Sequence, residues 1–243
     1  MTKLAVLSFL LLCSTSFSQE LSHPANGREL IRAMHDHYNG TWYRNLTFRQ
    51  QSQFFKNGKM DRVETWYEAL KAPVGLVIKF GSKESGSGIV FRNDTMFVFK
   101  NDTMQIRIRR VHDLLVLGFD VYVDDPGTTI KRLEEAGYNL DRLSVEKGAA
   151  GTSYVVGDDE HGRFWITADT YLFTKMKKKD AKGNETEVQF NNYTRVGDGW
   201  LSPEVVMIRN GQTVMKEVYS DWRVDEELPA SIFNVTSFQQ TTW

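Results

Sequence analysis

Two-residue turns between alternating segments restrict the fold of this chain more than any other feature. An Asn-Gly pair at 57–58 separates segments 46–55 and 60–70, in which apolar and polar residues alternate. Asn-Gly favours a hairpin turn because both residues tolerate a positive φ. A second Asn-Gly pair, at 210–211, also lies between two alternating segments. The pattern predicts antiparallel strands joined by short hairpins.

A repeated turn sequence lies between these two hairpins. Asn-Asp-Thr-Met occupies 93–96 and returns eight residues later at 101–104. We predict a three-strand meander over 89–92, 95–100 and 103–109, with an Asn-Asp turn at each corner. With the alternating segments that follow, the chain is expected to form about eleven antiparallel strands.

Helical spacing replaces the alternation in two places. Segment 27–38 has an apolar face at helical spacing, and Asn26 is expected to cap its start. The second place is an insertion at 112–138, where we expect Asp113 to cap a short helix and Thr128 to cap a second one. The prediction is therefore a β protein with an N-terminal helix and a helical insertion.

The composition fits one folded domain without a nucleic-acid partner. The chain has 243 residues, of which 41% are hydrophobic and 25% are charged. These values exclude a disordered chain. A formal net charge of −1 provides no general attraction to nucleic acid. We expect a mainly β (α+β) protein that forms a single domain over residues 19–243 and is a monomer.

The first 18 residues have the pattern of a cleavable signal peptide. Lys3 precedes an almost wholly apolar segment at 4–12. Ser16 and Ser18 then stand at the positions where a signal peptidase requires small residues before a cut at Gln19. The apolar segment is too short to span a membrane. The pattern predicts export of the chain.

The alternative to cleavage is a lipid anchor on Cys13, the single cysteine. Lipoprotein processing requires a small residue before the cysteine, and Leu12 stands there instead. We therefore favour cleavage before Gln19. The mature chain then has no cysteine, and so no disulfide and no thiol nucleophile.

The predicted meander has apolar residues on both faces. One face is expected to carry Val90, Phe97, Phe99, Met104, Ile106 and Ile108. The other is expected to carry Ile89, Phe91, Met96 and Val98 among Gln105, Arg107 and Arg109. A sheet with one solvated face shows a cleaner alternation, so each face must be covered. Two interpretations stay open: a filled sandwich or barrel, or an incompletely closed sheet around an apolar pocket with residues 112–138 as its lid.

The sequence contains little that indicates catalysis. It lacks the Gly-x-Ser-x-Gly and His-Glu-x-x-His motifs and a phosphate-binding glycine loop. His35 and His37 point to different sides of the predicted helix, so they do not form a metal site together. We expect no enzyme activity, no metal and no cofactor.

The order of elements resembles the outer-membrane lipoprotein-sorting (LolA/LolB-like) superfamily of Gram-negative periplasmic proteins. Two segments carry the resemblance. The first is Phe-Trp-Ile-Thr-Ala-Asp-Thr-Tyr-Leu at 164–172, which leads into a predicted hairpin. The second is Gly-Trp-Leu-Ser-Pro-Glu-Val-Val at 199–206. The end of the chain adds Leu-Pro at 228–229 and Ile-Phe at 232–233. One departure is Lys-Ala-Pro at 71–73, where the carriers have an Arg-Pro step whose arginine holds the lid.

The resemblance implies an unclosed antiparallel β-barrel with a helical lid over an apolar cavity. It also implies a non-catalytic periplasmic carrier or binding protein for lipid or lipoprotein acyl chains, with an envelope or membrane-bound partner protein. The alternative is a non-transporting interaction or sensor module of the same fold. The expected ligand-binding residues are Trp66, Tyr67, Phe97, Phe99, Met104, Ile106, Ile108, Leu114, Leu115, Leu117 and Phe119.

Overall fold

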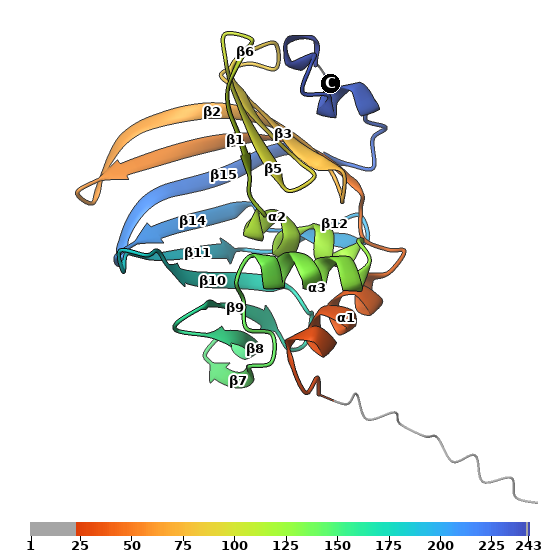
Figure 1. Cartoon of the computed structure of the whole chain (residues 1–243), viewed down its shortest axis with the longest axis vertical. Helices are drawn as coiled ribbons and strands as arrows, with labels where there is room; N and C mark the ends of the chain where they lie inside the picture. Colours follow the sequence, from red (N-terminus) through yellow and green to blue (C-terminus); the bar gives the residue numbers. More distant parts are fainter. Residues whose placement is uncertain (1–22, 242) are drawn as a thin grey trace, which may run out of the picture.

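The computed structural model describes residues 23–241 and residue 243, and strands are its main element (Figure 1). The predicted signal peptide and Cys13 lie outside the described residues. One antiparallel sheet has thirteen strands in the order β6-β5-β4-β3-β2-β1-β15-β14-β11-β10-β9-β8-β7. Since β6 and β7 are its two edges, the sheet is not closed into a barrel. The predicted mainly β fold with an unclosed sheet is confirmed.

The strand bounds follow the predicted segments closely. The first half contains β1 (Asn45–Lys56), β2 (Lys59–Lys71), β3 (Gly75–Phe80), β4 (Gly88–Arg92), β5 (Thr95–Lys100) and β6 (Thr103–Arg109). The second half contains β7 (Leu143–Gly148), β8 (Gly151–Asp158), β9 (Gly162–Thr167), β10 (Phe173–Lys179), β11 (Glu185–Asn191), β14 (Glu204–Arg209) and β15 (Gln212–Val224). The short strands β12 (Thr194–Val196) and β13 (Gly199–Leu201) form a separate sheet.

The described residues form fifteen strands, against about eleven predicted, and the division of two segments accounts for two of the additional strands. Asn192 interrupts segment 185–196 with a φ of 60°, and Ser202-Pro203 interrupts segment 199–209. Proline has no N–H to donate to a strand ladder, so the break after β13 has a direct cause.

The turn residues adopt the conformations that the sequence predicts. Asn57 and Gly58 have φ values of 53° and 72°. The Asn-Asp pairs at 93–94 and 101–102 and the Asn-Gly pair at 210–211 also have positive φ. These are the left-handed conformations of two-residue hairpin turns.

The predicted faces of β6 are wrong beyond its first residues. Phe99 pairs with Met104, but the next pair joins Val98 to Ile106, so Gln105 is an extra residue in a β-bulge. A single extra residue moves all later side chains to the opposite face. Ile106 and Ile108 therefore share a face with Val98 and not with Phe97 and Phe99.

The helices lie along one face of the curved sheet (Figure 1). They are α1 (Gly27–Tyr38), α2 (Asp113–Gly118), the 3₁₀ turn η1 (Asp120–Tyr122) and α3 (Pro126–Glu135). As predicted, the Asn26 side chain caps α1, accepting a bond of 3.0 Å from the Glu29 N–H. None of the helices in the described residues has the length and apolar character of a membrane-spanning segment.

The caps of α2 and α3 differ from the prediction. His112 caps α2 through Nδ1, which accepts from the Leu115 N–H at 3.2 Å, and Asp113 is already helical. Asp125 caps α3, accepting from the Thr128 N–H at 2.9 Å. Pro126 suits the first helical position because no helical bond needs its missing N–H.

The end of the chain covers the outer face of β2–β5. Two 3₁₀ turns there, η2 (Ala230–Phe233) and η3 (Phe238–Gln240), carry apolar residues that pack against Phe97 and Phe99. Phe238 stacks on Phe99 with ring centroids 4.2 Å apart. Lys79 is fully buried below, where its ammonium donates to the Phe238 carbonyl at 2.6 Å and lies 3.6 Å from the Phe238 ring centroid. The meander has apolar residues on both faces because the helices cover one and the C-terminal segment covers the other.

Replacing Phe238 with alanine should lower the free energy of unfolding by about 3 kcal/mol, since it removes a buried ring and uncovers Lys79. Urea unfolding followed by tryptophan fluorescence measures this loss. Gln240→Ala, at an exposed position of the same segment, is the control and should change stability by less than about 0.5 kcal/mol. Equal small effects of both changes would show that the C-terminal segment contributes little to the fold.

Candidate functional site

A cavity lies between the sheet and the helical insertion. The insertion, residues 112–138, contains α2, η1 and α3 and is called the lid below. The lid side of the cavity is formed by His112, Leu114, Leu115 and Phe119. The sheet side is formed by Phe48, Gln50, Trp66, Glu68, Leu70, Leu76, Ile78, Phe190, Val205, Met207, Glu217 and Tyr219.

The cavity is partly closed by its own side chains. It contains about 560 Å³ of atom-free space, its open mouth included, and the centre of a water molecule can reach about 80 Å³ of this. The accessible 80 Å³ is well below the roughly 300–1,000 Å³ of pockets that hold small ligands. In this arrangement the cavity has room for a short apolar group. A long acyl chain fits only when the lid moves away from the sheet.

The wall of the cavity is mainly apolar because alternate residues of the long strands face inward. On β2 the inward residues are Trp66, Glu68 and Leu70, and on β3 they are Leu76 and Ile78. The period of two places the residues between them on the other face of the sheet. From the opposite side, the apolar lid residues Leu114, Leu115 and Phe119 complete the wall. Leu115 is buried, and the other two are half-buried.

A polar group of residues interrupts the apolar floor. The Tyr219 hydroxyl donates to Glu217 Oε2 at 2.8 Å, and Gln50 donates to the Ser52 hydroxyl at 2.8 Å. Burial raises the pKa of Glu217 to about 7. Burial, and then the negative charge of Glu217, raises the pKa of Glu68 well above its usual value. Near neutral pH, Glu217 is therefore close to half-ionised, and burial favours the protonated form of Glu68 over its charged form.

His112, the basic residue on the cavity wall, is uncharged. Burial lowers the pKa of His112 to about 4, so its ring is neutral at physiological pH. Its Nδ1 is already used as the cap of α2. Within the described residues, no group of three or more His, Cys, Asp or Glu is arranged to hold a metal ion.

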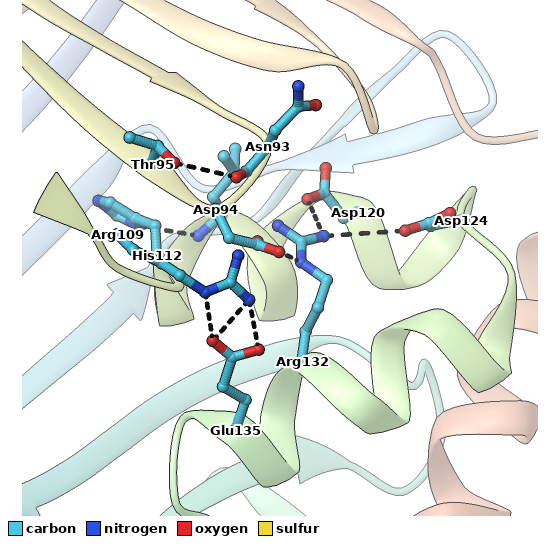
Figure 2. A network of polar contacts seen from close by, with 10 residues as sticks. Asn93, Asp94, Thr95, Arg109, His112, Asp120, Asp124, Arg132 and Glu135 are labelled. Atoms are coloured by element: carbon cyan, nitrogen blue, oxygen red, sulfur yellow. Dashed lines mark hydrogen bonds and ion pairs between the residues drawn. The ribbon is translucent and has the colours of Figure 1, made fainter. Parts of the chain in front are cut away.

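Ion pairs fasten the lid to the sheet, and Figure 2 shows two of them. Arg132 of α3 lies at their centre: its Nε is 2.8 Å from Asp94 Oδ1 and its Nη1 is 2.7 Å from Asp120 Oδ2. Asp94 belongs to the turn between β4 and β5, whereas Asp120 belongs to the lid. Arg132 therefore joins the interior of the lid to a corner of the sheet. Its side chain is only 14% exposed, and that of Asp120 is 2% exposed.

Two further contacts hold the lid at other strands. The Arg109 guanidinium of β6 donates to both Glu135 carboxylate oxygens, each 2.7 Å from its Nη2 (Figure 2). Lys178 of β10 donates to Asp113 and, at 2.8 Å, to the Ala136 carbonyl. The three attachments lie on β6, on the β4–β5 turn and on β10, so they hold the lid at separated places.

The structure brings together only some of the expected ligand-binding residues. Trp66, Leu114, Leu115 and Phe119 line the cavity. Leu117 is buried in the adjoining core and is not part of the cavity wall.

The other expected residues lie elsewhere. Tyr67 faces the opposite side of the sheet from Trp66, because neighbours on a strand alternate. Phe97 and Phe99 lie under the C-terminal segment. Met104 is 41% exposed on the edge strand, and Ile106 and Ile108, also there, are similarly exposed. Binding of a ligand by any of these residues stays a prediction.

Sequence reasoning missed the polar floor of the cavity. Glu68 stands in phase with Trp66 and Leu70 on β2, and Glu217 stands in phase with Met215 and Tyr219 on β15. The sequence did contain a signal for this polar floor: each glutamate stands two residues from apolar residues that face the same side of its strand.

The unclosed sheet with its helices resembles in fold solved structures of LolA-like and lipoprotein-sorting proteins. No protein-family model matches the sequence, and no curated protein is significantly similar to it. Solved structures nevertheless share its fold. A LolA superfamily protein from Nitrosomonas europaea has a TM-score of 0.58 and 14% identity, covering 84% of this chain and 97% of that one.

Two other structures agree. A protein domain assigned to outer membrane lipoprotein sorting in Vibrio parahaemolyticus has a TM-score of 0.61 and 14% identity, covering 88% of this chain and 98% of that one. A DUF1329 family protein from Desulfovibrio piger has a TM-score of 0.59 and 16% identity, covering 86% of this chain and 95% of that one. The predicted resemblance is therefore confirmed as a resemblance of fold.

Proposed function

We propose that this chain is a periplasmic carrier or binding protein for acylated or otherwise hydrophobic ligands. The observation that carries the proposal is the apolar cavity between the sheet and a lid fastened by ion pairs. The fold shared with a lipoprotein-sorting domain agrees with it. The protein acts by binding and release and not by catalysis.

In the proposed mechanism, the lid moves away from the sheet and an acyl chain is buried between them. The chain then replaces the contacts that lid and sheet make with each other. Apolar surface removed from water contributes about 25 cal/mol per Å², before the cost of ordering the ligand. Opening separates Arg132 from Asp94 and Arg109 from Glu135, and water then solvates the separated charges. The Arg109–Glu135 pair is already exposed in the closed arrangement, and exposed pairs contribute at most about 1 kcal/mol. The lid therefore opens at a moderate cost, which suits a ligand that must be released again.

The lid of this chain carries its own arginine. The arginine expected before β3 from the family resemblance is replaced by Lys71-Ala72-Pro73. Arg132 makes the connection from the opposite side, since it extends from the lid to Asp94 on the sheet. The lid is thus fastened, although by a different residue.

A non-transporting interaction module of the same fold is the second candidate. Edge strand β6 favours it, because all seven of its residues are exposed and its outer backbone groups have no neighbouring strand. Such an edge can accept a strand from another protein. A stable complex with an envelope protein, in the absence of lipid uptake, would favour this function over the carrier.

Charged residues in the lid wall should abolish ligand uptake. We expect Leu114→Arg and Phe119→Asp each to lower the affinity of the delipidated protein for a fluorescent acyl ligand at least about tenfold, because a charge cannot be buried against an acyl chain. Both side chains are half-buried, so the fold should tolerate the changes. Equilibrium fluorescence titration measures the affinity.

Met104→Arg is the matched control, since Met104 is exposed on β6 outside the cavity. This variant should bind the acyl ligand as the unmodified protein does. Stoichiometric uptake that is unchanged in both lid variants would contradict the assignment of the cavity. Failure of the unmodified protein to bind any acyl ligand would contradict the carrier function itself.

A further inference from the structure

Two buried carboxyl groups face a cavity whose wall contains no lysine or arginine. Glu68 is 4% exposed and Glu217 is 8% exposed, and both belong to the cavity wall. The remaining polar groups there are Gln50, Tyr219 and the neutral His112. The lining thus presents acidic groups without a cation to balance them.

Glu68 has no hydrogen-bond partner among the described residues, although it is nearly fully buried. Its neighbours on the same face are Phe48 on β1, Ile78 on β3, and Trp66 and Leu70 on its own strand. All of these are apolar or present an apolar surface. Leaving a polar group without a partner in the interior costs about 1–3 kcal/mol. A leucine at position 68 would avoid this free-energy cost. The stability of the fold therefore does not explain why a glutamate stands there.

We propose that the cavity receives an amphiphile whose polar end is an amine, with Glu68 and Glu217 holding the ammonium group while the apolar wall encloses its chain. This inference rests on the proposed function and names the class of ligand. An ammonium group has three donors, and the wall of the same cavity offers oxygen acceptors from the two carboxyl groups and from the Tyr219 hydroxyl, which is bonded to Glu217. The ligand supplies the positive charge that the wall lacks.

The alternatives fit the same groups less well. A carboxylate or phosphate end would bring its negative charge to two acidic side chains and to a wall without a lysine or arginine, so its burial would be disfavoured. A hydroxyl end would donate a single neutral hydrogen bond, which is about half as strong as a bond between charged groups. The chemistry of the cavity therefore favours an amine over an acid, with an alcohol between them.

Three ligands with the same chain test the inference. Calorimetric titration of the delipidated protein with dodecylamine, dodecanol and dodecanoate near neutral pH should give the tightest binding for the amine, by at least about tenfold over the alcohol. Glu68→Gln and Glu217→Gln should each weaken the amine at least about fivefold and leave the alcohol unchanged within about twofold. Both changes keep the shape of the side chain, so folding is retained.

Glu160→Gln is the matched control, because Glu160 is an exposed carboxylate in the β8–β9 turn. Vesicles with and without an aminolipid distinguish a free amine from an amine on a lipid headgroup: extraction only of the aminolipid identifies the headgroup as the source. Equal affinity for all three dodecyl ligands, or amine binding that both glutamine variants retain, would overturn the inference and leave the carrier function standing. Failure of all three ligands and of the acyl ligand above would overturn both.

Discussion

Replacing Arg132 with methionine should lower the free energy of unfolding by about 3–5 kcal/mol, because it leaves the buried Asp120 carboxylate without its cation. The contact with Asp94 is lost at the same time, which frees the lid from the β4–β5 turn. Urea unfolding measures the loss. An accompanying increase in the rate of acyl-ligand uptake would show that the released lid opens more readily.

Arg109→Met provides the comparison for this effect. Arg109 also pairs with the lid, but its side chain is 63% exposed and that of Glu135 is 46% exposed. Exposed pairs contribute at most about 1 kcal/mol even with good geometry. Combining Asp120→Asn with Arg132→Met should recover part of the stability by removing the uncompensated charge. A loss for Arg132→Met no larger than that for Arg109→Met would rule out Arg132 as the main attachment of the lid.

The stability of the protein should fall as the pH rises through neutrality because of Glu217 and Glu68. Burial raises the pKa of Glu217 from 4.5 when unfolded to about 7 when folded. Between these values the folded state binds more protons, so the stabilisation is complete below the unfolded pKa and is lost as the pH rises through the folded one. For Glu217 alone the loss is about 3 kcal/mol. Glu68 changes stability in the same direction.

Unfolding in urea at about pH 5 and about pH 8 measures this loss. The groups facing the two carboxyls are the Tyr219 hydroxyl, Gln50 and His112. Burial lowers the pKa of His112 from 6.5 to about 4, so its protonation in the unfolded state makes stability rise with pH and opposes part of the loss. The double variant Glu68→Gln, Glu217→Gln isolates the carboxyl contribution, because it retains His112. It should lose most of the difference and should be more stable than the unmodified protein at the higher pH. An unchanged pH dependence in the double variant would show that the two carboxyls are already ionised in the folded state.

Local signals in the sequence were sufficient for most of the fold. The turns at 57–58, 93–94 and 101–102 could be predicted because Asn, Asp and Gly tolerate positive φ whatever surrounds them. Helix α1 could be predicted because its apolar stripe and its Asn26 cap belong to one short segment. The helical insertion also followed from local spacing, and the resemblance to lipoprotein-sorting proteins favoured an unclosed sheet with a lid over the filled sandwich or barrel that the pattern also allowed.

Features that depend on distant contacts could not be predicted in this way. The bulge at Gln105 shifts the faces of β6 although the turn before it is a regular hairpin turn. Phe97 and Phe99 have the alternation of cavity residues, but the C-terminal segment, more than a hundred residues later, covers their face. The cavity in the structure lies under the predicted helical insertion, but Phe97 and Phe99 do not line it.

The two Asn-Asp-Thr-Met copies show how one sequence can serve two purposes. Asp94 and Asp102 both adopt the positive φ that their hairpins require, with values of 52° and 61°. Only Asp94 also pairs with Arg132. Glycine at position 94 would preserve the corner between the strands and cut the tether of the lid, whereas glycine at position 102 would preserve the corner with no such effect. A single substitution in this turn would therefore change how firmly the lid is attached to the sheet, without altering any side chain of the cavity wall.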